Sequence, residues 1–113
     1  MPRREEADEL ALEVGQRIRQ IREDRGMTIQ QLAEESEIGS KGHLSNMERG
    51  LVRPNIQTLK QVADGLEVLP LDLVTFPKRD LRQRLVDLTR RLRKNKISEL
   101  VRLIMNWRKQ EAI

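Results

Sequence analysis

The side chains best placed for chemistry lie between residues 40 and 49, where hydrogen-bond donors and acceptors follow one another closely. If this segment is a helix, Lys41, Gly42 and His43 occupy its first turn, and Asn46 lies one turn further along the same side. A lysine ammonium can donate to guanine O6 or N7, and an asparagine amide can pair with adenine through two hydrogen bonds. On an isolated helix these would be ordinary solvated residues. Whether they are that or contacts to DNA bases depends on the elements that surround them.

Two short helices joined by a tight turn are predicted around these residues. Thr28 and Gln31 have the spacing of a capping box, which starts a helix over residues 28–36. Ser40 is placed to cap a second helix over residues 40–49, which ends at Gly50. Helices braced in this way can place the second one in the major groove of DNA.

Apolar periodicity predicts further helices on both sides of this pair. A helix over residues 8–25 is expected from four inward residues at helical spacing, Leu10, Val14, Ile18 and Ile21. Asn55 is the expected N-cap of a helix over residues 56–66, and a short helix is expected at 70–75. No stretch alternates as a strand would, so the front of the chain, residues 9–76, is predicted to be a five-helix domain.

The pattern changes after Phe76-Pro77. Leucines then recur at steps of 4, 3 and 4, Lys94-Asn95-Lys96 interrupts them, and a second apolar face follows with Ser98 as a possible cap. We expect a two-helix hairpin over residues 77–113, packed on the front domain or on a second copy. A homodimer is favoured because the apolar row would otherwise be exposed. Its expected contact residues are Leu81, Leu85, Leu88, Leu92, Leu100, Ile104 and Trp107.

Charge is distributed unevenly along the 113 residues. Residues 1–77 hold 10 Lys+Arg and 14 Asp+Glu, whereas residues 78–113 hold 12 and 4, so net charges of −4 and +8 add to the overall +4. The stretch from Lys78 to Lys96 has nine basic residues against two aspartates. It is interpreted as a solvated outer face, as added contacts to DNA phosphates, or as a docking surface for an acidic partner.

Several classes of function are disfavoured. With one histidine and no cysteine, the chain has no disulfide or thiolate metal site, and its carboxylates have no convergent partner, so we expect no enzyme, metal or cofactor. There is no apolar run of about 20 residues and no signal-peptide core, so no membrane contact is expected. A cytoplasmic, nucleoid-associated protein is predicted, with residues 1–8 as a mobile start.

The ordered motifs over residues 14–74 resemble the phage-repressor and Cro-like helix-turn-helix family, also called Xre-type. The residues that carry the resemblance are Gly15-Gln16-Arg17-Ile18, Arg22, Gly26-Met27-Thr28, Leu32-Ala33, Leu44-Ser45, Glu48-Arg49-Gly50, Arg53-Pro54, Leu59, Ala63, Leu66-Glu67-Val68 and Asp72-Leu73. The resemblance implies a bacterial or phage DNA-binding regulator whose domain is a Cro/repressor-like helical bundle. It also implies a structural ion pair between Arg22 and Glu48.

The resemblance places the family's base-reading positions on Lys41, Gly42 and Asn46. Gly42 has no side chain where many relatives have a long polar one. Ile29 replaces a glutamine that binds phosphate in relatives, so either Gln30 takes that role or the contact is lost. The full set of residues expected at DNA is Thr28, Gln30, Ser40, Lys41, Gly42, His43, Ser45, Asn46, Arg49, Arg53 and Asn55.

Two functions from different classes follow. The first is a sequence-specific, double-stranded DNA-binding transcriptional regulator, a homodimer that reads the major groove with the helix at 40–49. The second is a protein-interaction module, such as an antitoxin or adaptor, whose basic C-terminal hairpin binds a protein partner. The acidic front domain slightly favours the second, and the helix-turn-helix motifs favour the first.

Overall fold

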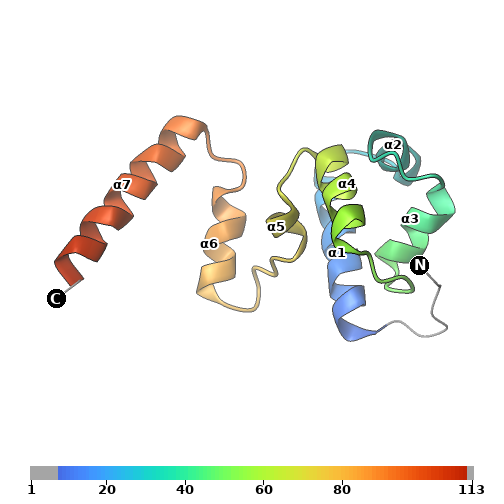
Figure 1. Ribbon diagram of the computed structural model, residues 1–113, viewed down its shortest axis with the longest axis horizontal. Coiled ribbons are helices and arrows are strands. Elements are labelled where there is room, and N and C mark those ends of the chain that lie inside the picture. The colour runs from blue at the N-terminus through green and yellow to red at the C-terminus, as the bar shows by residue number, and fades with distance from the viewer. Residues whose placement is uncertain (1–7, 112–113) are drawn as a thin grey trace.

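Seven helices make up residues 8–111, the part of the chain that the computed structural model describes (Figure 1). The front domain contains five of them, α1 (Glu9–Asp24), α2 (Ile29–Glu35), α3 (Lys41–Glu48), α4 (Ile56–Leu66) and α5 (Pro70–Leu73). The C-terminal arm contains the other two, α6 (Leu81–Thr89) and α7 (Lys94–Glu111). Strands are absent from residues 8–111, and the predicted all-α class is confirmed.

Local side-chain caps set where the helices of the front domain begin. Thr28 Oγ1 accepts from the Gln31 N–H at 3.0 Å, and the Gln31 side chain accepts from the Thr28 N–H at 2.8 Å. Ser40 and Asn55 cap α3 and α4 in the same way. Asp8 caps α1, while the other residues of the predicted mobile start, 1–7, lie outside the described residues. These caps satisfy helix N–H groups that have no partner within the helix.

The core of the front domain lies between α1, α2, α3, α4 and α5. Three of the four residues expected to face inward from the first helix, Val14, Ile18 and Ile21, are buried there. The expectation for Leu10 is wrong, because its side chain is 61% exposed. Leu10 lies in the first turn of α1, beyond the end of the core, and Ala11 is the buried residue of that turn. Helical spacing alone does not reveal where a core ends.

The C-terminal arm has two helices, but the break between them differs from the predicted position. Lys94, Asn95 and Lys96 form the first turn of α7, and the break lies at residues 90–93. Ser98 therefore lies inside the helix and is not its cap. The Lys96 and Ile97 N–H groups both donate to the Arg93 carbonyl, at 3.0 and 3.1 Å, which starts α7. Polar residues interrupt an apolar pattern without preventing helix formation.

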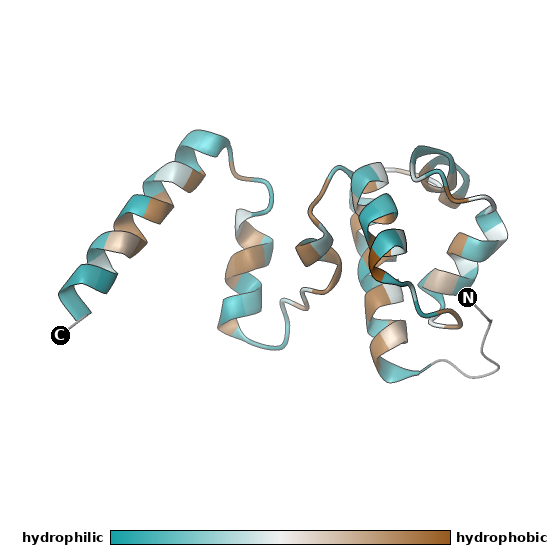
Figure 2. Cartoon of the chain, viewed as in Figure 1, coloured by the Kyte–Doolittle hydropathy of each residue, from teal (hydrophilic) through white to brown (hydrophobic). Residues whose placement is uncertain are grey.

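Neither helix of the arm contains a buried residue. In Figure 1, α6 lies next to the front domain, whereas α7 projects away from it and gives the chain an elongated shape of 52 × 26 × 22 Å. Apolar residues recur along both helices in Figure 2. Within residues 8–111, no helix combines the length and apolar character needed to cross a membrane.

Candidate nucleic-acid interface

Helix α3 has an apolar side that faces the core and a polar side that faces outward. Leu44 and Met47 are fully buried, and they fix the rotation of this short helix. Lys41 and Gly42 are consequently exposed, and Asn46 is half-buried on the outer side, as are His43 and Ser45. The Ser40 hydroxyl accepts from the His43 N–H at 3.0 Å and holds the first turn in place. The polar groups of α3 are thus presented on a rigid support.

Helix α1 braces the end of α3 through a buried ion pair. Arg22 Nε and Nη2 donate to the two carboxylate oxygens of Glu48, at 2.7 and 3.0 Å. The side chains are only 10% and 5% exposed, and Arg22 also donates to the Met27 carbonyl at 2.8 Å. Gly15 lets the helices approach closely, because a Cβ there would lie 2.4 Å from the Met47 carbonyl oxygen. This brace holds α3 at a fixed angle to α1.

The basic side chains of the front domain are almost all neutralised by internal carboxylates. Within residues 8–77, the basic side chains with an ion pair are Arg17, Arg19, Arg22, Arg25, Arg53 and Lys60. Within residues 8–77, only Lys41 and Arg49 have no such partner, and they lie at the two ends of α3. The positive charge that this domain can offer to an anion is therefore concentrated on α3.

Several residues predicted to contact phosphates have partners within the chain. Gln30 Nε2 donates to Glu34 Oε1 at 3.0 Å, and the Arg53 guanidinium pairs with Asp8. Thr28 and Asn55 use their side-chain oxygens as helix caps. To bind a phosphate, Arg53 would have to give up its ion pair with Asp8. Arg49 is exposed and has no ion pair to give up within residues 8–77.

The residues predicted to form a dimer contact remain on the surface of the single chain. Leu81, Leu85, Leu88 and Leu92 are between 43% and 82% exposed. On α7, Ile104 and Trp107 are 38% and 52% exposed, and Leu100 is half-buried. Met105 of α7 is 55% exposed as well, and α7 contains no buried residue.

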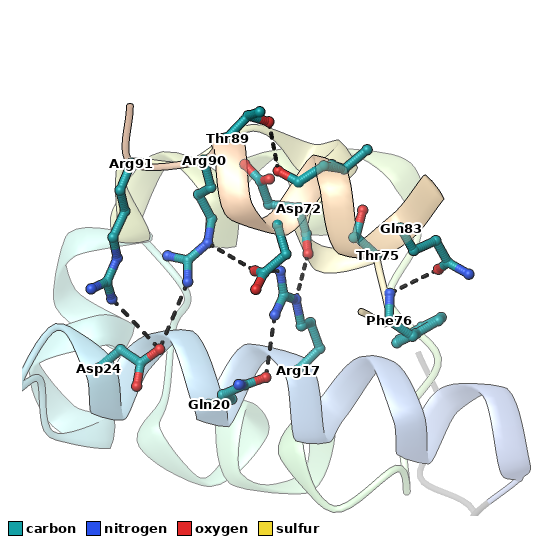
Figure 3. A network of polar contacts seen from close by, with 12 residues as sticks. Arg17, Gln20, Asp24, Asp72, Thr75, Phe76, Gln83, Thr89, Arg90 and Arg91 are labelled. Carbon is teal, nitrogen blue, oxygen red and sulfur yellow. Dashed lines mark hydrogen bonds and ion pairs between the residues drawn. The ribbon is translucent and has the colours of Figure 1, made fainter. Parts of the chain in front are cut away.

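Within residues 8–111, no group of three or more His, Cys, Asp or Glu side chains is arranged so that it could hold a metal ion. The structure instead reveals contacts that sequence reasoning missed. Arg17 is a buried arginine that donates to the Asp72 carbonyl at 2.8 Å and to Asp87 at 2.6 Å (Figure 3 labels Arg17 and Asp72). Asp87 is 70 positions away from Arg17, so no local spacing signals the pair.

A family model described as "Helix-turn-helix domain" matches residues 13–75. The chain belongs to this family. The helix-turn-helix domain of this chain is 41% identical over 56 residues to the HTH-type transcriptional regulator SinR of Bacillus subtilis, covering 49% of this chain and 50% of SinR. It is 42% identical over 55 residues to the immunity repressor protein of Bacillus phage phi105, covering 49% and 38%. The match spans half or less of these curated relatives.

A solved structure extends the likeness beyond the helix-turn-helix domain. A chain of the SinR protein/SinI protein complex superimposes with a TM-score of 0.59 and 32% identity, over 86% of this chain and 98% of that one. The family model covers only residues 13–75, so this match includes part of the C-terminal arm. The five-helix arrangement predicted from the sequence is therefore that of the known helix-turn-helix regulators.

Proposed function

We propose that this chain is a sequence-specific, double-stranded DNA-binding transcriptional regulator that reads the major groove with α3. The observation that carries this proposal is the concentration of unpaired positive charge at α3, at Lys41 and Arg49, on a helix whose other side is anchored in the core. DNA phosphates attract such charges, and base edges are read by side chains of a helix in the groove. The relatives named as a transcriptional regulator and an immunity repressor support the same function.

The roles of individual residues follow from where they lie on α3. Lys41 and Asn46 face outward and are assigned to base edges, with His43 and Ser45 beside them. Gly42 leaves open space next to Lys41, since a Cβ there would meet nothing within 4 Å. Arg49 is assigned to a phosphate, together with the backbone N–H groups at the starts of the helices capped by Thr28, Ser40 and Asn55.

A homodimer is the second part of the proposal. The arm leaves both of its helices without a buried residue, and the exposed apolar side chains include Trp107. Burying them against a second copy gives a two-fold dimer, with two α3 helices in successive major grooves about 34 Å apart. Such a regulator works on the nucleoid in the cytoplasm, and this family assignment points to regulation and not to catalysis.

The DNA-reading assignment is tested by changing Lys41 and Asn46 together to alanine. The binding site is first selected from source-genome fragments at roughly physiological salt, where non-specific attraction is weak. Each base contact contributes about 1–3 kcal/mol, so the double variant should lose about 2–6 kcal/mol and bind the selected site about thirtyfold or more weaker. Binding to a scrambled duplex should change far less, because phosphate contacts ignore sequence.

The matched control for this experiment is the double variant Asn95→Ala and Lys96→Ala. It removes the same residue types from exposed positions of α7, far from α3. We expect the control to bind the selected site within about threefold of the parent, as loss of one distant charge should. If both double variants lost the same affinity for the selected site, the loss would come from the reduced positive charge of the protein as a whole. That result would refute the assignment of Lys41 and Asn46.

A protein-interaction module remains the second candidate function. It is favoured by the exposed apolar face of α7 and by the likeness to a chain of the SinR protein/SinI protein complex. If this function is the primary one, the Lys41/Asn46 variant behaves like the parent, selection yields no DNA motif, and substitutions on α7 remove the binding of a partner.

A further inference from the structure

Helix α6 is held on the front domain by polar contacts. Its leucines face away from the domain, since Leu81, Leu85 and Leu88 are at least half exposed, and none of its residues is buried. Its polar residues, by contrast, reach across to α1. Hydrogen bonds between charged groups are strong and directional, so they determine an orientation where apolar packing is thin. The position of the C-terminal arm therefore depends on a few named ion pairs.

The central contact of this attachment is made by Arg17. Its side chain is 2% exposed, and its three nitrogens donate to the Asp72 carbonyl at 2.8 Å, to Gln20 at 3.2 Å and to Asp87 of α6 at 2.6 Å. Asp87 also accepts from Arg90 Nε at 3.3 Å. A buried guanidinium needs such partners, because leaving one of its donors unpaired is costly. Arg17 thus ties α5 and α6 to α1.

A second contact lies further along the same two helices. Asp24 Oδ2 is 3.7 Å from Arg90 Nη2 and 3.6 Å from Arg91 Nη2. Figure 3 shows both arginines reaching toward Asp24. Ahead of α6, Arg79 pairs with Glu13 of α1. The side chains on α1 that make these three contacts recur at steps of four and seven, so they share one face of the helix.

The two outer contacts have the same spacing on both partners. From Glu13 to Asp24, and from Arg79 to Arg90, the chain advances by the same 11 positions, so the segment with α6 runs parallel to α1. A helix held at one point can pivot, whereas contacts spread over about 16 Å of α1 prevent it. We call these three contacts the α1–α6 latch, and its residues are Glu13, Arg17, Asp24, Arg79, Asp87, Arg90 and Arg91.

Helix α1 connects this latch to the DNA-reading helix. One side of α1 is fixed to α3 by the Arg22–Glu48 pair and by the close approach at Gly15. Another side is fixed to α6 by the α1–α6 latch. The orientation of α3 is therefore transmitted through a single rigid helix to the start of the arm. In a dimer joined through the arms, that orientation determines how far apart the two α3 helices lie.

We propose that the α1–α6 latch sets the half-site spacing that this regulator recognises, with Arg17 and Asp87 as positioning residues that never touch DNA. The inference rests on the proposed dimeric, DNA-reading function. In the dimer, a rigid attachment holds the helix-turn-helix domain of one copy at a single distance from that of the other copy. One operator spacing is then strongly favoured. With a loose attachment, the distance between the two helix-turn-helix domains varies widely. The preference for one operator spacing then falls, while each half-site is read as before.

The latch is tested with Asp87→Ala, which removes its central carboxylate and leaves a good helix former in α6. Asp24→Asn is a second, safer variant, because Asp24 is 41% exposed and pairs only with Arg90 and Arg91 in the described residues. The matched control is Glu99→Ala, which removes one carboxylate from an exposed pair on α7 that does not touch the front domain.

The first measurement is the distance distribution between two spin labels, at Glu35→Cys on α2 and Arg84→Cys on α6. Both positions are exposed, and the chain has no cysteine of its own. We expect one narrow distribution for the parent and the Glu99→Ala control, and a distribution about twice as wide for Asp87→Ala, as a released tether predicts. Equal widths in the parent and in both latch variants would overturn the proposal.

The second measurement is affinity for operators whose half-sites are moved apart or together by two base pairs. The parent should prefer its selected spacing by about tenfold or more, and Asp87→Ala by less than about threefold, with half-site affinity unchanged. If the variant keeps the sharp preference, the latch does not set the spacing, although the proposed function stands. If the parent itself selects no paired half-sites, the proposed function fails, and the spacing role fails with it.

Discussion

The Arg22–Glu48 ion pair yields the most direct quantitative prediction, through the variant Glu48→Ala. Removing one partner of a buried ion pair typically costs about 3–5 kcal/mol, because the other charge is left without compensation. Arg22 would keep its hydrogen bond to the Met27 carbonyl and a carboxylate of Glu23 at 3.9 Å. Because these partners partly compensate the charge of Arg22, we expect the free energy of unfolding to fall by the lower end of that range, about 3 kcal/mol.

That loss is large for a domain of this size. Natural domains are stable by about 5–15 kcal/mol, and each kcal/mol shifts the melting temperature of a 60–100-residue domain by about 4–8 °C. Glu48→Ala should therefore melt about 12–24 °C below the parent. Circular dichroism during urea and thermal unfolding measures both quantities. Asp64→Ala is the control, because its pair with Lys60 is 60% exposed on both sides and contributes under about 1 kcal/mol.

The same variant separates a structural role from a DNA-reading role. Glu48 is buried against α1, so it should not contact DNA, and binding measured well below the lower melting temperature should match that of the parent. The reasoning fails if Glu48→Ala unfolds like the parent yet loses DNA binding. It also fails if the variant loses no more stability than Asp64→Ala does.

Four further predictions use other parts of the structure. Gly50→Ala should destabilise the domain by more than about 1 kcal/mol, because its φ is +74° and its Cβ would lie 2.6 Å from the Leu12 Cα. Gly42→Ala should instead stabilise it by up to about 1 kcal/mol in the same unfolding assay, and any loss of DNA affinity would reveal close backbone approach there. Partial burial alone raises the pKa of Asp87, but the hydrogen bonds and charges of Arg17 and Arg90 outweigh it, so the net pKa is lowered. The stability difference between the parent and Asp87→Ala should therefore persist from neutral pH to about 4 and vanish only as the pH falls through the lowered pKa, as a pH series of urea titrations will measure. Trp107 is the only tryptophan, so dimerisation through α7 should shift its fluorescence to the blue as protein concentration rises, and a monomer by light scattering at micromolar concentration would refute the dimer.

The elements that could be predicted from the sequence are those fixed by local rules. The caps at Thr28, Ser40 and Asn55 are hydrogen bonds between residues three positions apart, so their spacing can be recognised in the sequence. Leu44 and Met47, which are three positions apart on α3, are both buried, as the helical period places them on one face. The α1–α6 latch depends instead on the pairing of Arg17 with a residue 70 positions away. Nothing in the surroundings of Asp87 in the sequence distinguishes it from a solvated aspartate.

The errors have a related cause. Leu10 fits the apolar period of α1 but lies past the end of the core, and only the positions of the other helices reveal that end. The break in the arm was expected at Lys94-Asn95-Lys96 because the apolar pattern stops there, whereas the helix itself depends on backbone hydrogen bonds to Arg93. Apolar periodicity records which faces are covered, and it is a weaker guide to where a helix begins.

The net negative charge of the front domain is compatible with DNA binding once the positions of the individual charges are considered. Carboxylates such as Glu13, Glu48 and Asp64 face basic partners of the same chain, so their charge is largely cancelled where it lies. Lys41 and Arg49 have no such partner in the described residues; Lys41 is the first residue of α3 and Arg49 is its C-cap. The field that approaching DNA meets is set by these local, uncompensated charges, since screening removes contributions from beyond about 8–10 Å. A net charge of −4 over residues 1–77 therefore does not describe the surface that α3 presents.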